Sequence, residues 1–503
     1  MPSSADRQLA VRHTAASLAA AAVLALGAAA AHPLLAQGAP PKAASSPTSL
    51  APHQRLAREV YEELVEINTA DSVGSVTKAA EAVAKRFRAA GFPESDVRVL
   101  VPQGKPTKGN VVVRYRGRSN AKTKPLLLLA HLDVVAALRS DWTLDPFVLT
   151  EKDGYFYGRG TADDKAMASI FVANLLRDKR EGWVPERDVI LALTADEEGG
   201  DANGVEWLLA EHRDLIDAAY AINEGGGGSL RNGKFVSNNV QAAEKVPVNF
   251  TLTATNRGGH SSVPRPDNAI YVLAHALVAV ERFKFPVQLN EVSGAFFGRT
   301  AALETPAMGA AMRALVANPG DSAAVAAVSA DPRYNSMLRT TCVATRLAGG
   351  HAYNALPQTA SANVNCRIVP SQTPEEVRAT IARVVGDTGI RITETVPIRE
   401  KSGAAPSPLT AEVMGPVTDL TRALFGANVP VIPVMSTGAT DGRFLRAAGI
   451  PTYGVSGIFS DPTDARAHGR DERLLVKSFY DGQEFLYRLV HRLAGGTGRA
   501  AAN

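Results

Sequence analysis

Cysteine is scarce in this chain, because 503 residues contain only Cys342 and Cys366. Two cysteines are too few for a disulfide framework or for a thiolate metal site, so both classes of protein are excluded. The two residues lie in strand-like stretches of one region. They either pair with each other or remain separate buried thiols, and the sequence leaves both alternatives open.

An excess of charge of one sign is also missing. Lysine and arginine number 54 and aspartate and glutamate number 50, which gives a net charge of +4. This net charge is small for a chain of this length, so we expect neither a nucleic-acid partner nor electrostatic binding to a membrane surface. With 45% hydrophobic and 21% charged residues, the composition is that of a globular protein. The length predicts two or more domains.

Long apolar runs are absent except near the N-terminus. Residues 15–31 form an uncharged stretch rich in alanine, leucine and valine, preceded by two arginines and followed by small residues. This pattern predicts a secretory signal peptide over residues 1–36, and hence an exported protein, periplasmic or secreted. An uncleaved membrane anchor is a weaker alternative because the run is short and alanine-rich. Residues 37–50 are rich in alanine, proline and serine and predict a flexible lead-in.

Residues 51–245 alternate between helical and strand patterns, which predicts an α/β domain with a mostly parallel sheet. Apolar residues at helical spacing predict helices over 52–68 and from residue 76 to Gly91. Short, continuous apolar runs predict buried strands. These runs cover 126–130, 189–193 and 219–222.

A different pattern begins near residue 246. Apolar residues alternate over 248–254, and the following segments predict the order β-α-β-β-α-β, which is a ferredoxin-like plan. We therefore expect a small domain over 246–398, with inserted helices in its alanine-rich stretch 285–336. Residues 399–497 return to α/β alternation, so the small domain interrupts the larger one.

Metal-binding residue types follow the predicted strands of the larger domain. His131 and Asp133 follow the first buried run, Glu197 and Glu198 follow the second, and Glu224 follows the third. The carboxyl ends of parallel strands meet at one edge of a sheet, where such folds bind ligands. We therefore expect these side chains to lie close together.

Two further loops carry residues of the same kind, Asp163 with Asp164 and, much later, His468. Two imidazoles and three carboxylates can hold two metal ions if one carboxylate bridges them. Two metals about 3.5–4 Å apart polarise a carbonyl and activate a water, whose proton a further carboxylate can take. Taken singly, each residue fits a solvated turn, and Asp133 or Asp164 fits a helix cap. An accidental gathering at five strand exits is a poorer explanation.

Six motifs in the chain resemble those of one enzyme family, and they occur in that family's order. The family is the dizinc metallopeptidases that include carboxypeptidase G, carboxypeptidase S, aminoacylase, acetylornithine deacetylase and succinyl-diaminopimelate desuccinylase. The resemblance implies a zinc-aminopeptidase-like three-layer catalytic domain interrupted by a ferredoxin-like lid. The motifs are His131-Leu132-Asp133, Gly158–Lys165, Thr194–Gly199, Glu224-Gly225-Gly226, Gly258–Ser262 and His468-Gly469.

The resemblance implies two zinc ions per subunit, with cobalt or manganese as alternatives. Asp163 resembles the carboxylate that bridges the two metals. His131 and Glu224 would complete one metal site, and Glu198 and His468 would complete the other.

Two further carboxylates take other roles by the same resemblance. Glu197 is similar to the general base, which would deprotonate the bridging water and pass the proton to the leaving amine. Asp133 resembles a carboxylate behind the ligands that orients the His131 ring or the local network.

The predicted lid carries residues similar to substrate-contacting ones. His260 resembles an oxyanion-stabilising histidine that in several relatives reaches the partner subunit's site, which implies a homodimer through the lid. Asn354 resembles a substrate contact. Arg367 resembles a carboxylate-binding arginine, although a strand-surface charge is a competing interpretation. Gly438 opens a loop similar to one whose N–H groups receive the substrate carboxylate. The 285–336 insertion would cover or replace the dimer contact.

These inferences predict an exported, metal-dependent hydrolase of an amide bond next to a free carboxylate. A carboxypeptidase or dipeptidase acting on small peptides is the first hypothesis, because residues 131–200 most resemble the carboxypeptidase S and G branch. An N-acyl amino acid amidohydrolase is the alternative. A metal-binding protein without turnover is a third hypothesis, against which Glu197 argues, since a binder needs no base.

Overall fold

The computed structural model describes residues 50–118, 123–386, 389–395 and 404–495. The predicted signal peptide, nearly all of the predicted lead-in and the boundary expected at residue 398 lie outside these ranges. No helix in the described ranges is both long enough and apolar enough to cross a bilayer.

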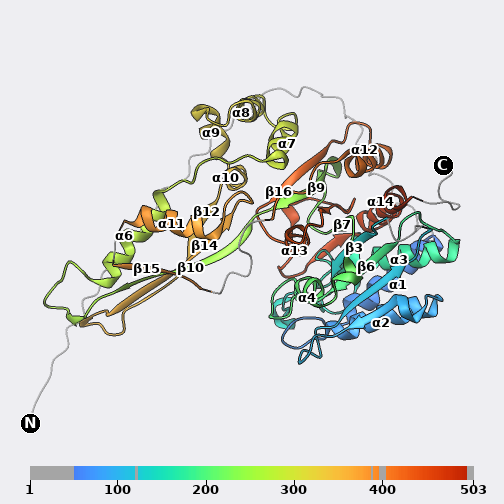
Figure 1. Cartoon of the computed structure of the whole chain (residues 1–503), viewed down its shortest axis with the longest axis horizontal. Coiled ribbons are helices and arrows are strands. Elements are labelled where there is room, and N and C mark those ends of the chain that lie inside the picture. Colours follow the sequence, from blue (N-terminus) through green and yellow to red (C-terminus); the bar gives the residue numbers. More distant parts are fainter. Residues whose placement is uncertain (1–49, 119–122, 387–388, 396–403, 496–503) are drawn as a thin grey trace, which may run out of the picture. The chain divides into compact units, whose positions relative to one another are not determined.

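A ten-stranded mixed sheet forms the centre of the larger domain (Figure 1). Its middle strands β6, β3, β7 and β17 run parallel to one another. The apolar runs predicted as strands are buried along their whole length in β3 and β6, as expected for parallel strands covered on both faces. The order is β1 (Val97–Leu100), β2 (Asn110–Tyr115), β6 (Val189–Thr194), β3 (Leu126–His131), β7 (Tyr220–Asn223), β17 (Thr452–Gly454), β9 (Lys234–Glu244), β8 (Gly227–Arg231) and β18 (Phe459–Ser460), with β16 (Val431–Ser436) paired to β9.

Alternate residues of β3 enter two different cores, since successive side chains of a strand point to opposite faces. Leu126 and Leu128 join the core under one helix layer, whereas Leu127 and Leu129 join the core under the other. The first layer contains α1 (Pro52–Glu66), α2 (Val76–Ala89), α3 (Lys165–Glu181), α12 (Ala411–Phe425) and α14 (Val476–Ala494), and the second contains α4 (Gly204–Glu211), α5 (Arg213–Ile216) and α13 (Gly442–Ala447). The predicted three-layer α/β class is therefore confirmed.

The interrupting domain is a four-stranded antiparallel sheet in the order β12-β14-β10-β15. The chain runs through β10 (Val246–Thr255), α6 (Ala269–Arg282), β12 (Thr341–Gly349), β14 (Thr359–Ile368), α11 (Pro374–Val385) and β15 (Ile390–Glu394). This is the predicted ferredoxin-like order, and we call this domain the lid. Cys342 and Cys366 lie directly opposite each other on β12 and β14 and form a disulfide, so the first of the two alternatives for the cysteines is the observed one.

The alanine-rich stretch between α6 and β12 forms four helices with a small core of their own. They are α7 (Glu291–Thr300), α8 (Pro306–Ala317), α9 (Ser322–Ser329) and α10 (Pro332–Leu338). Helix α7 packs along the edge strand β16, where the Arg299 guanidinium donates a hydrogen bond of 2.7 Å to the Val431 carbonyl. The insertion therefore covers one edge of the large sheet.

The hairpin of β8 and β9 was not predicted. Its first strand begins among glycines 225–228, and its second carries Asn238, Asn239 and Gln241, so neither strand shows the expected apolar alternation. Short strands also form two small sheets, β19 (Arg473–Leu475) with β5 (Tyr155–Tyr157) and β4 (Thr150–Lys152), and β11 (Gly259–His260) with β13 (Ala355–Leu356).

Candidate metal centre

Three neighbouring parallel strands deliver most of the predicted metal ligands to one edge of the sheet. His131 is the last residue of β3 and lies opposite Thr194 at the end of β6, from which Glu197 and Glu198 follow. Glu224 comes directly after β7. Asp163 is presented by the loop before α3.

Asp163 lies between the two histidines, with one carboxylate oxygen toward each. Its Oδ1 is 3.0 Å from Nε2 of His131, and its Oδ2 is 3.1 Å from Nε2 of His468. His131 ends strand β3, whereas His468 lies in a loop more than 300 residues later. The structure therefore brings together the residues that the resemblance assigned to a bridging position.

The remaining predicted ligands divide between the two histidines. Glu198 Oε2 is 2.8 Å from Nε2 of His468, and Glu224 Oε1 is 3.9 Å from Nε2 of His131. Ligand atoms of His131, Asp163 and Glu198 all lie within 4.8 Å of one another. Both histidines thus lie next to Asp163, and each also lies next to one glutamate, Glu224 for His131 and Glu198 for His468.

The charges of this cluster are balanced only in part. Burial raises the pKa of Glu224 well above its ordinary value and that of Glu198 to about 7, and neighbouring carboxylates add to both shifts. Burial alone would lower the pKa of His131, but the bond to Asp163 and the nearby acids raise it well above its ordinary value. Cations placed among these donors would relieve the repulsion, and mixed imidazole and carboxylate donors fit zinc or a similar ion.

Asp133 positions its neighbours through both its backbone and its side chain. Its carbonyl accepts a hydrogen bond of 2.9 Å from Nδ1 of His131, which leaves Nε2 of the neutral ring free to bind a metal. Its two carboxylate oxygens accept the backbone N–H groups of Glu197 and Glu198, at 3.2 and 3.0 Å. Asp133 thereby fixes the loop that carries both glutamates.

Glu197 belongs to the same cluster but has different close neighbours from Glu198. One of its oxygens is within 4.8 Å of ligand atoms of His131 and Glu224. Burial raises the pKa of Glu197 to about 8, and the carboxylates of Asp441 and Glu198 contribute in the same direction. A carboxylate with a raised pKa beside a metal centre can accept and return a proton near neutral pH.

Asp196, the first acid of the same run, has a structural role. Its side chain is 1% exposed and forms an ion pair with the buried Lys108. It also accepts the N–H of Ala202 at 3.2 Å, and its backbone φ of 59° turns the chain. The resemblance gave roles to Glu197 and Glu198 and none to Asp196, whose partner Lys108 the sequence did not indicate.

Glu472 supports the loop of Asp163 and was not predicted as a site residue. It is fully buried and forms an ion pair of 2.6 Å with Arg159. Its Oε1 accepts the N–H groups of Ala162 and Asp163 at 2.7 and 3.2 Å. The sequence feature that could have identified Glu472 is its position four residues after His468, in the same loop.

The two lid residues His260 and Asn354 are exposed. The His260 ring contacts the Ser262 hydroxyl through Nδ1, at 2.7 Å, and the Asn354 carbonyl accepts the N–H of Ser261 at 3.0 Å. Within the part of the chain that the structure describes, no hydrogen bond or ion pair joins either residue to the metal-binding cluster.

Arg367 lies half-buried on β14. Burial and the nearby Arg443 guanidinium lower the pKa of Arg367, and Arg367 in turn affects the buried Lys245. Three basic groups therefore lie close together where the lid strands join the larger domain. The N–H of Gly438, by contrast, donates to the Ser436 hydroxyl at 3.0 Å within its own loop.

Comparisons with known proteins agree with this geometry. The model of peptidase family M20/M25/M40 matches residues 127–492. The human N-fatty-acyl-amino acid synthase/hydrolase PM20D1 is 28% identical over 382 residues, 74% of each chain. A probable carboxypeptidase S-like protein of Dictyostelium discoideum is 27% identical over 470 residues, 85% of this chain and 88% of that one.

A solved structure supports the fold. The family M20 metallo-carboxypeptidase Sso-CP2 from Sulfolobus solfataricus superposes with a TM-score of 0.62 at 18% identity, over 87% of this chain and 99% of that one. The family match spans the motifs that carry His131, Asp163, Glu198, Glu224 and His468. The chain therefore belongs to peptidase family M20/M25/M40, and it is a metal-dependent peptidase or amidohydrolase.

Proposed function

We propose that the protein hydrolyses an amide bond adjacent to a free carboxylate, as a carboxypeptidase or dipeptidase, at a centre of two zinc ions. The observation that carries this proposal is the position of Asp163 between His131 and His468. His131 and Glu224 would hold one ion, and His468 and Glu198 the other. When bound, the ions would polarise the scissile carbonyl and lower the pKa of a water molecule.

The residues around this centre supply the proton transfers. Glu197 is the general base, because it lies beside His131 and Glu224, has no ligand role in this proposal and has a raised pKa. It takes a proton from the attacking water and delivers it to the leaving nitrogen. Asp133 holds the backbone of Glu197, so that the base keeps its position during both transfers.

Arg367 is the proposed anchor for the substrate's free carboxylate. A guanidinium can bind a carboxylate through two parallel hydrogen bonds. Burial lowers the pKa of Arg367 and that of the neighbouring Lys245. An anion bound beside them would stabilise their charged forms. Asn354 and the loop of Gly438 are proposed to contact the same end of the substrate.

An N-acyl amino acid is the second candidate substrate. It contains the same amide next to a free carboxylate, and the similarity to the human N-fatty-acyl-amino acid synthase/hydrolase favours it. Rates for dipeptides and for N-acyl amino acids, each with and without a chelator, test both candidates. If the zinc-loaded enzyme hydrolyses neither class of substrate, the proposal is refuted.

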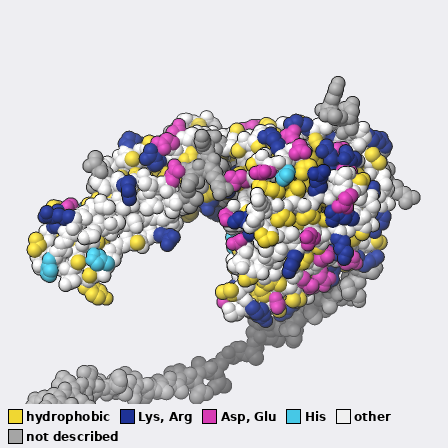
Figure 2. Space-filling view, turned by 60° about the horizontal axis from the view of Figure 1, so that its bottom comes forward, with side chains coloured by type: hydrophobic (Ala, Val, Ile, Leu, Met, Phe, Trp, Pro, Cys, Tyr) yellow, Lys and Arg dark blue, Asp and Glu magenta, His cyan; other side chains and the backbone are white. Residues whose placement is uncertain are grey.

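We further propose that His260 acts at the partner subunit's site in a homodimer formed through the lid. Its exposure and its lack of a described contact with its own cluster support this arrangement. Figure 2 shows hydrophobic and histidine side chains together at one end of the lid. Exposed apolar residues of the lid include Val263, Tyr271, Leu347 and Tyr353. Sedimentation of the wild type and of a Leu347→Asp variant tests the dimer, which only the wild type should form.

Export is the last part of the proposal. The N-terminal sequence has the pattern of a signal peptide, and the disulfide between Cys342 and Cys366 is typical of an oxidising compartment. Fractionation of cells that express the full chain should place the shortened, mature protein outside the cytoplasm. Retention of the full-length chain inside would contradict this.

A further inference from the structure

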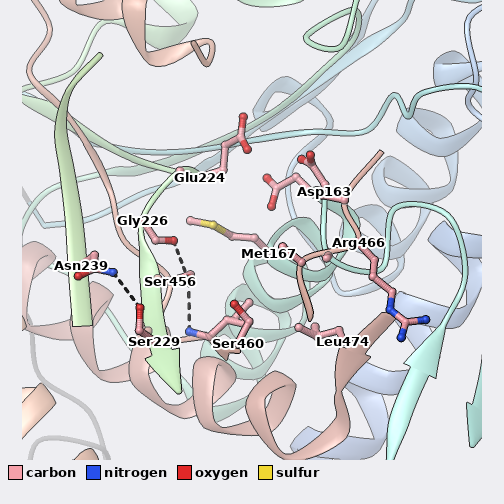
Figure 3. A pocket seen from close by; sticks show the side chains of 18 of the residues that line it. Asp163, Met167, Glu224, Gly226, Ser229, Asn239, Ser456, Ser460, Arg466 and Leu474 are labelled. Atoms are coloured by element: carbon pink, nitrogen blue, oxygen red, sulfur yellow. Dashed lines mark hydrogen bonds between the residues drawn. The ribbon is translucent and has the colours of Figure 1, made fainter. Parts of the chain in front are cut away.

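The cavity of about 370 Å³ that Asp163 and Glu224 line belongs to the candidate metal centre (Figure 3). A second cavity, of about 190 Å³, lies in the lid and shares no lining residue with the first. It is enclosed by the end of α6 and the segment that follows, by the junction of α10 with β12, and by α11. Because liquid water occupies about 30 Å³ per molecule, this space suits a small ligand.

Arg339 contributes a charged group to the wall of this second cavity. It joins α10 to β12 and is 6% exposed. Its Nη1 donates to the Phe285 carbonyl at 3.1 Å and its Nη2 to the Ser329 hydroxyl at 3.0 Å, whereas its Nε has no partner among the described residues. Both acceptors are neutral. A guanidinium has five N–H groups, so Arg339 keeps donors for a further acceptor.

Arg339 also lacks a counter-charge within the ranges that the structure describes. No ion pair joins it to a described acid, and burial lowers its pKa without an opposing effect from a carboxylate. Glu281 and Lys284 line the same cavity, but both are exposed and their charges are of opposite sign. An unpaired charge is costly to remove from water, and buried arginines are therefore usually paired. The surroundings of Arg339 thus favour an anion beside it.

Apolar side chains form the other part of the wall. Phe283 and Phe285 meet edge to face with their ring centres 5.0 Å apart, and Ile381 of α11 is 2% exposed. The other apolar lining residues are Val280, Cys342, Val343 and Val384. These residues favour a ligand that has an apolar body as well as a charge.

The remaining polar side chains of the wall are two threonines and an asparagine. The Thr340 hydroxyl accepts the N–H of Val369 at 3.1 Å, and the Thr341 hydroxyl accepts a hydrogen bond of 3.3 Å from Lys245. Asn335 differs, because its Oδ1 is buried and has no partner among the described residues. A half-turn of this amide puts its NH₂ group in the same place, where it can donate to a ligand oxygen.

We propose that the lid cavity binds a small monocarboxylate with a compact apolar body and that Arg339 pairs with the carboxylate. Charge-assisted hydrogen bonds between a guanidinium and a carboxylate are stronger than bonds between neutral groups. The rings of Phe283 and Phe285 and the side chain of Ile381 cover the apolar body. Inorganic phosphate supplies the charge but leaves this apolar wall uncovered. The site is independent of the proposed reaction, because none of its residues takes part in that reaction.

Thermal unfolding of the zinc-loaded, full-length enzyme tests this site, with benzoate as the probe. Benzoate should raise the unfolding midpoint in a saturable way, since a ligand that binds only the folded state stabilises it. Benzamide keeps the ring without the charge, and acetate keeps the charge without the ring. At equal ionic strength, the dissociation constants of both should exceed that of benzoate by at least about tenfold.

Two variants place benzoate in this cavity. Arg339→Met removes a buried charge that has no described counter-charge, so the protein should stay folded, and benzoate should no longer raise its midpoint. Val343 lines the cavity and is 58% exposed, so Val343→Trp should fill the space without disturbing the core and weaken benzoate binding by at least about tenfold. Arg313→Met is the matched control, at an exposed arginine of α8 that does not line the cavity. It should respond to benzoate like the wild type.

Arg367→Met separates the lid cavity from the metal centre, where Arg367 is the proposed anchor for the substrate's carboxylate. The rise of the midpoint with benzoate should persist in this variant. If the rise is lost in Arg367→Met and retained in Arg339→Met, benzoate binds at the metal centre and the proposed lid site is wrong. An equal rise with benzamide or inorganic phosphate, or no rise in the wild type, would also overturn it.

Discussion

Glu472 accepts the backbone N–H of Asp163 at 3.2 Å, although the two residues are 309 positions apart. The same carboxylate forms a buried ion pair with Arg159, which belongs to the loop that leads to Asp163. Both partners are almost inaccessible, with side chains 1% and 3% exposed. The residue between the two histidines is thus held in place by a charge pair that contacts its backbone N–H.

Replacing Glu472 by glutamine should therefore weaken both stability and metal binding. The variant leaves the Arg159 charge buried without a counter-charge, which costs about 3–5 kcal/mol. It also loosens the loop of Asp163, so we expect kcat/KM to fall by at least about tenfold. The thermal unfolding midpoint and the zinc content after dialysis measure the two effects.

A surface pair provides the control for this prediction. Glu94 pairs with Arg88 at 2.7 Å, but its side chain is 74% exposed, and such pairs contribute about 0–1 kcal/mol. Glu94→Gln should therefore behave like the wild type. Equal midpoints for all three proteins would show that the buried pair does not hold the loop.

The three consecutive acids after β6 should respond differently to loss of charge. Glu197→Gln removes the proposed base but no proposed ligand, so turnover should fall by about 100-fold or more while zinc content stays constant. Glu198→Gln should lower zinc content. Elemental analysis and steady-state kinetics on the same preparations separate these effects, and loss of zinc from the Glu197 variant would show that the two roles are exchanged.

Asp196→Asn should instead act on stability. It breaks the ion pair with Lys108, so the unfolding midpoint should fall, whereas turnover per folded molecule should stay within about tenfold of the wild type. A variant with a normal midpoint and no turnover would place Asp196 in the chemistry.

The sequence made the strand exits visible because β3 is a continuous apolar run that ends in His131, and β6 is one that Glu197 follows three residues after its end. Parallel strands bring such exits together whatever the loops between them do. The fold class, the ferredoxin-like order of the lid and the gathering of the predicted ligands therefore followed from local patterns. Asp163 and His468 were candidates from their residue types, but their roles as bridging carboxylate and ligand needed the resemblance, since they lie in loops without a periodic signal.

Other features depend on contacts between distant positions. The sequence Asp196-Glu197-Glu198 does not indicate which acid pairs with Lys108, because the backbone conformation of the loop after β6 determines the pairing. The pairing of Arg159 with Glu472 joins two loops 313 residues apart. The hairpin of β8 and β9 was missed because its packing uses glycine and amide side chains in place of an apolar stripe.

Removal of metal should lower stability as well as activity. A ligand that binds only the folded state stabilises it by about 4 kcal/mol at a thousand times its dissociation constant. In its absence the carboxylates of Glu198 and Glu224 stay buried close to Asp163. A chelator should therefore lower the unfolding midpoint, and zinc should restore it.

The base variant serves as the control for metal removal. Glu197→Gln should show the same zinc-dependent rise of the midpoint as the wild type, whereas His468→Ala should show a smaller one. A midpoint that does not change with zinc in any of these proteins would mean that the cluster does not bind the ion.

Lys245 predicts a pH dependence of stability that is independent of the metal centre. It lies between β9 and β10, is fully buried, and donates from Nζ to the Thr341 hydroxyl at 3.3 Å. Burial, with Arg367 nearby, lowers the pKa of Lys245 from 10.5 to about 7. Between these two pH values the unfolded chain binds a proton at this lysine that the folded chain does not bind.

Because the unfolded state then binds more protons, this group makes stability rise with pH over that window, by up to about 1.4 kcal/mol per unit. Below pH 7 both states are protonated and the cost of the buried charge is constant. Lys245→Met keeps the length of the side chain and removes the charge. Its advantage in free energy of unfolding over the wild type should therefore be largest at pH 7 and shrink toward pH 10.

Urea unfolding at several pH values measures this difference. Lys477→Met, at a side chain that is 73% exposed, should show no such trend, and a constant difference for Lys245→Met would mean that the lysine stays charged in the folded protein.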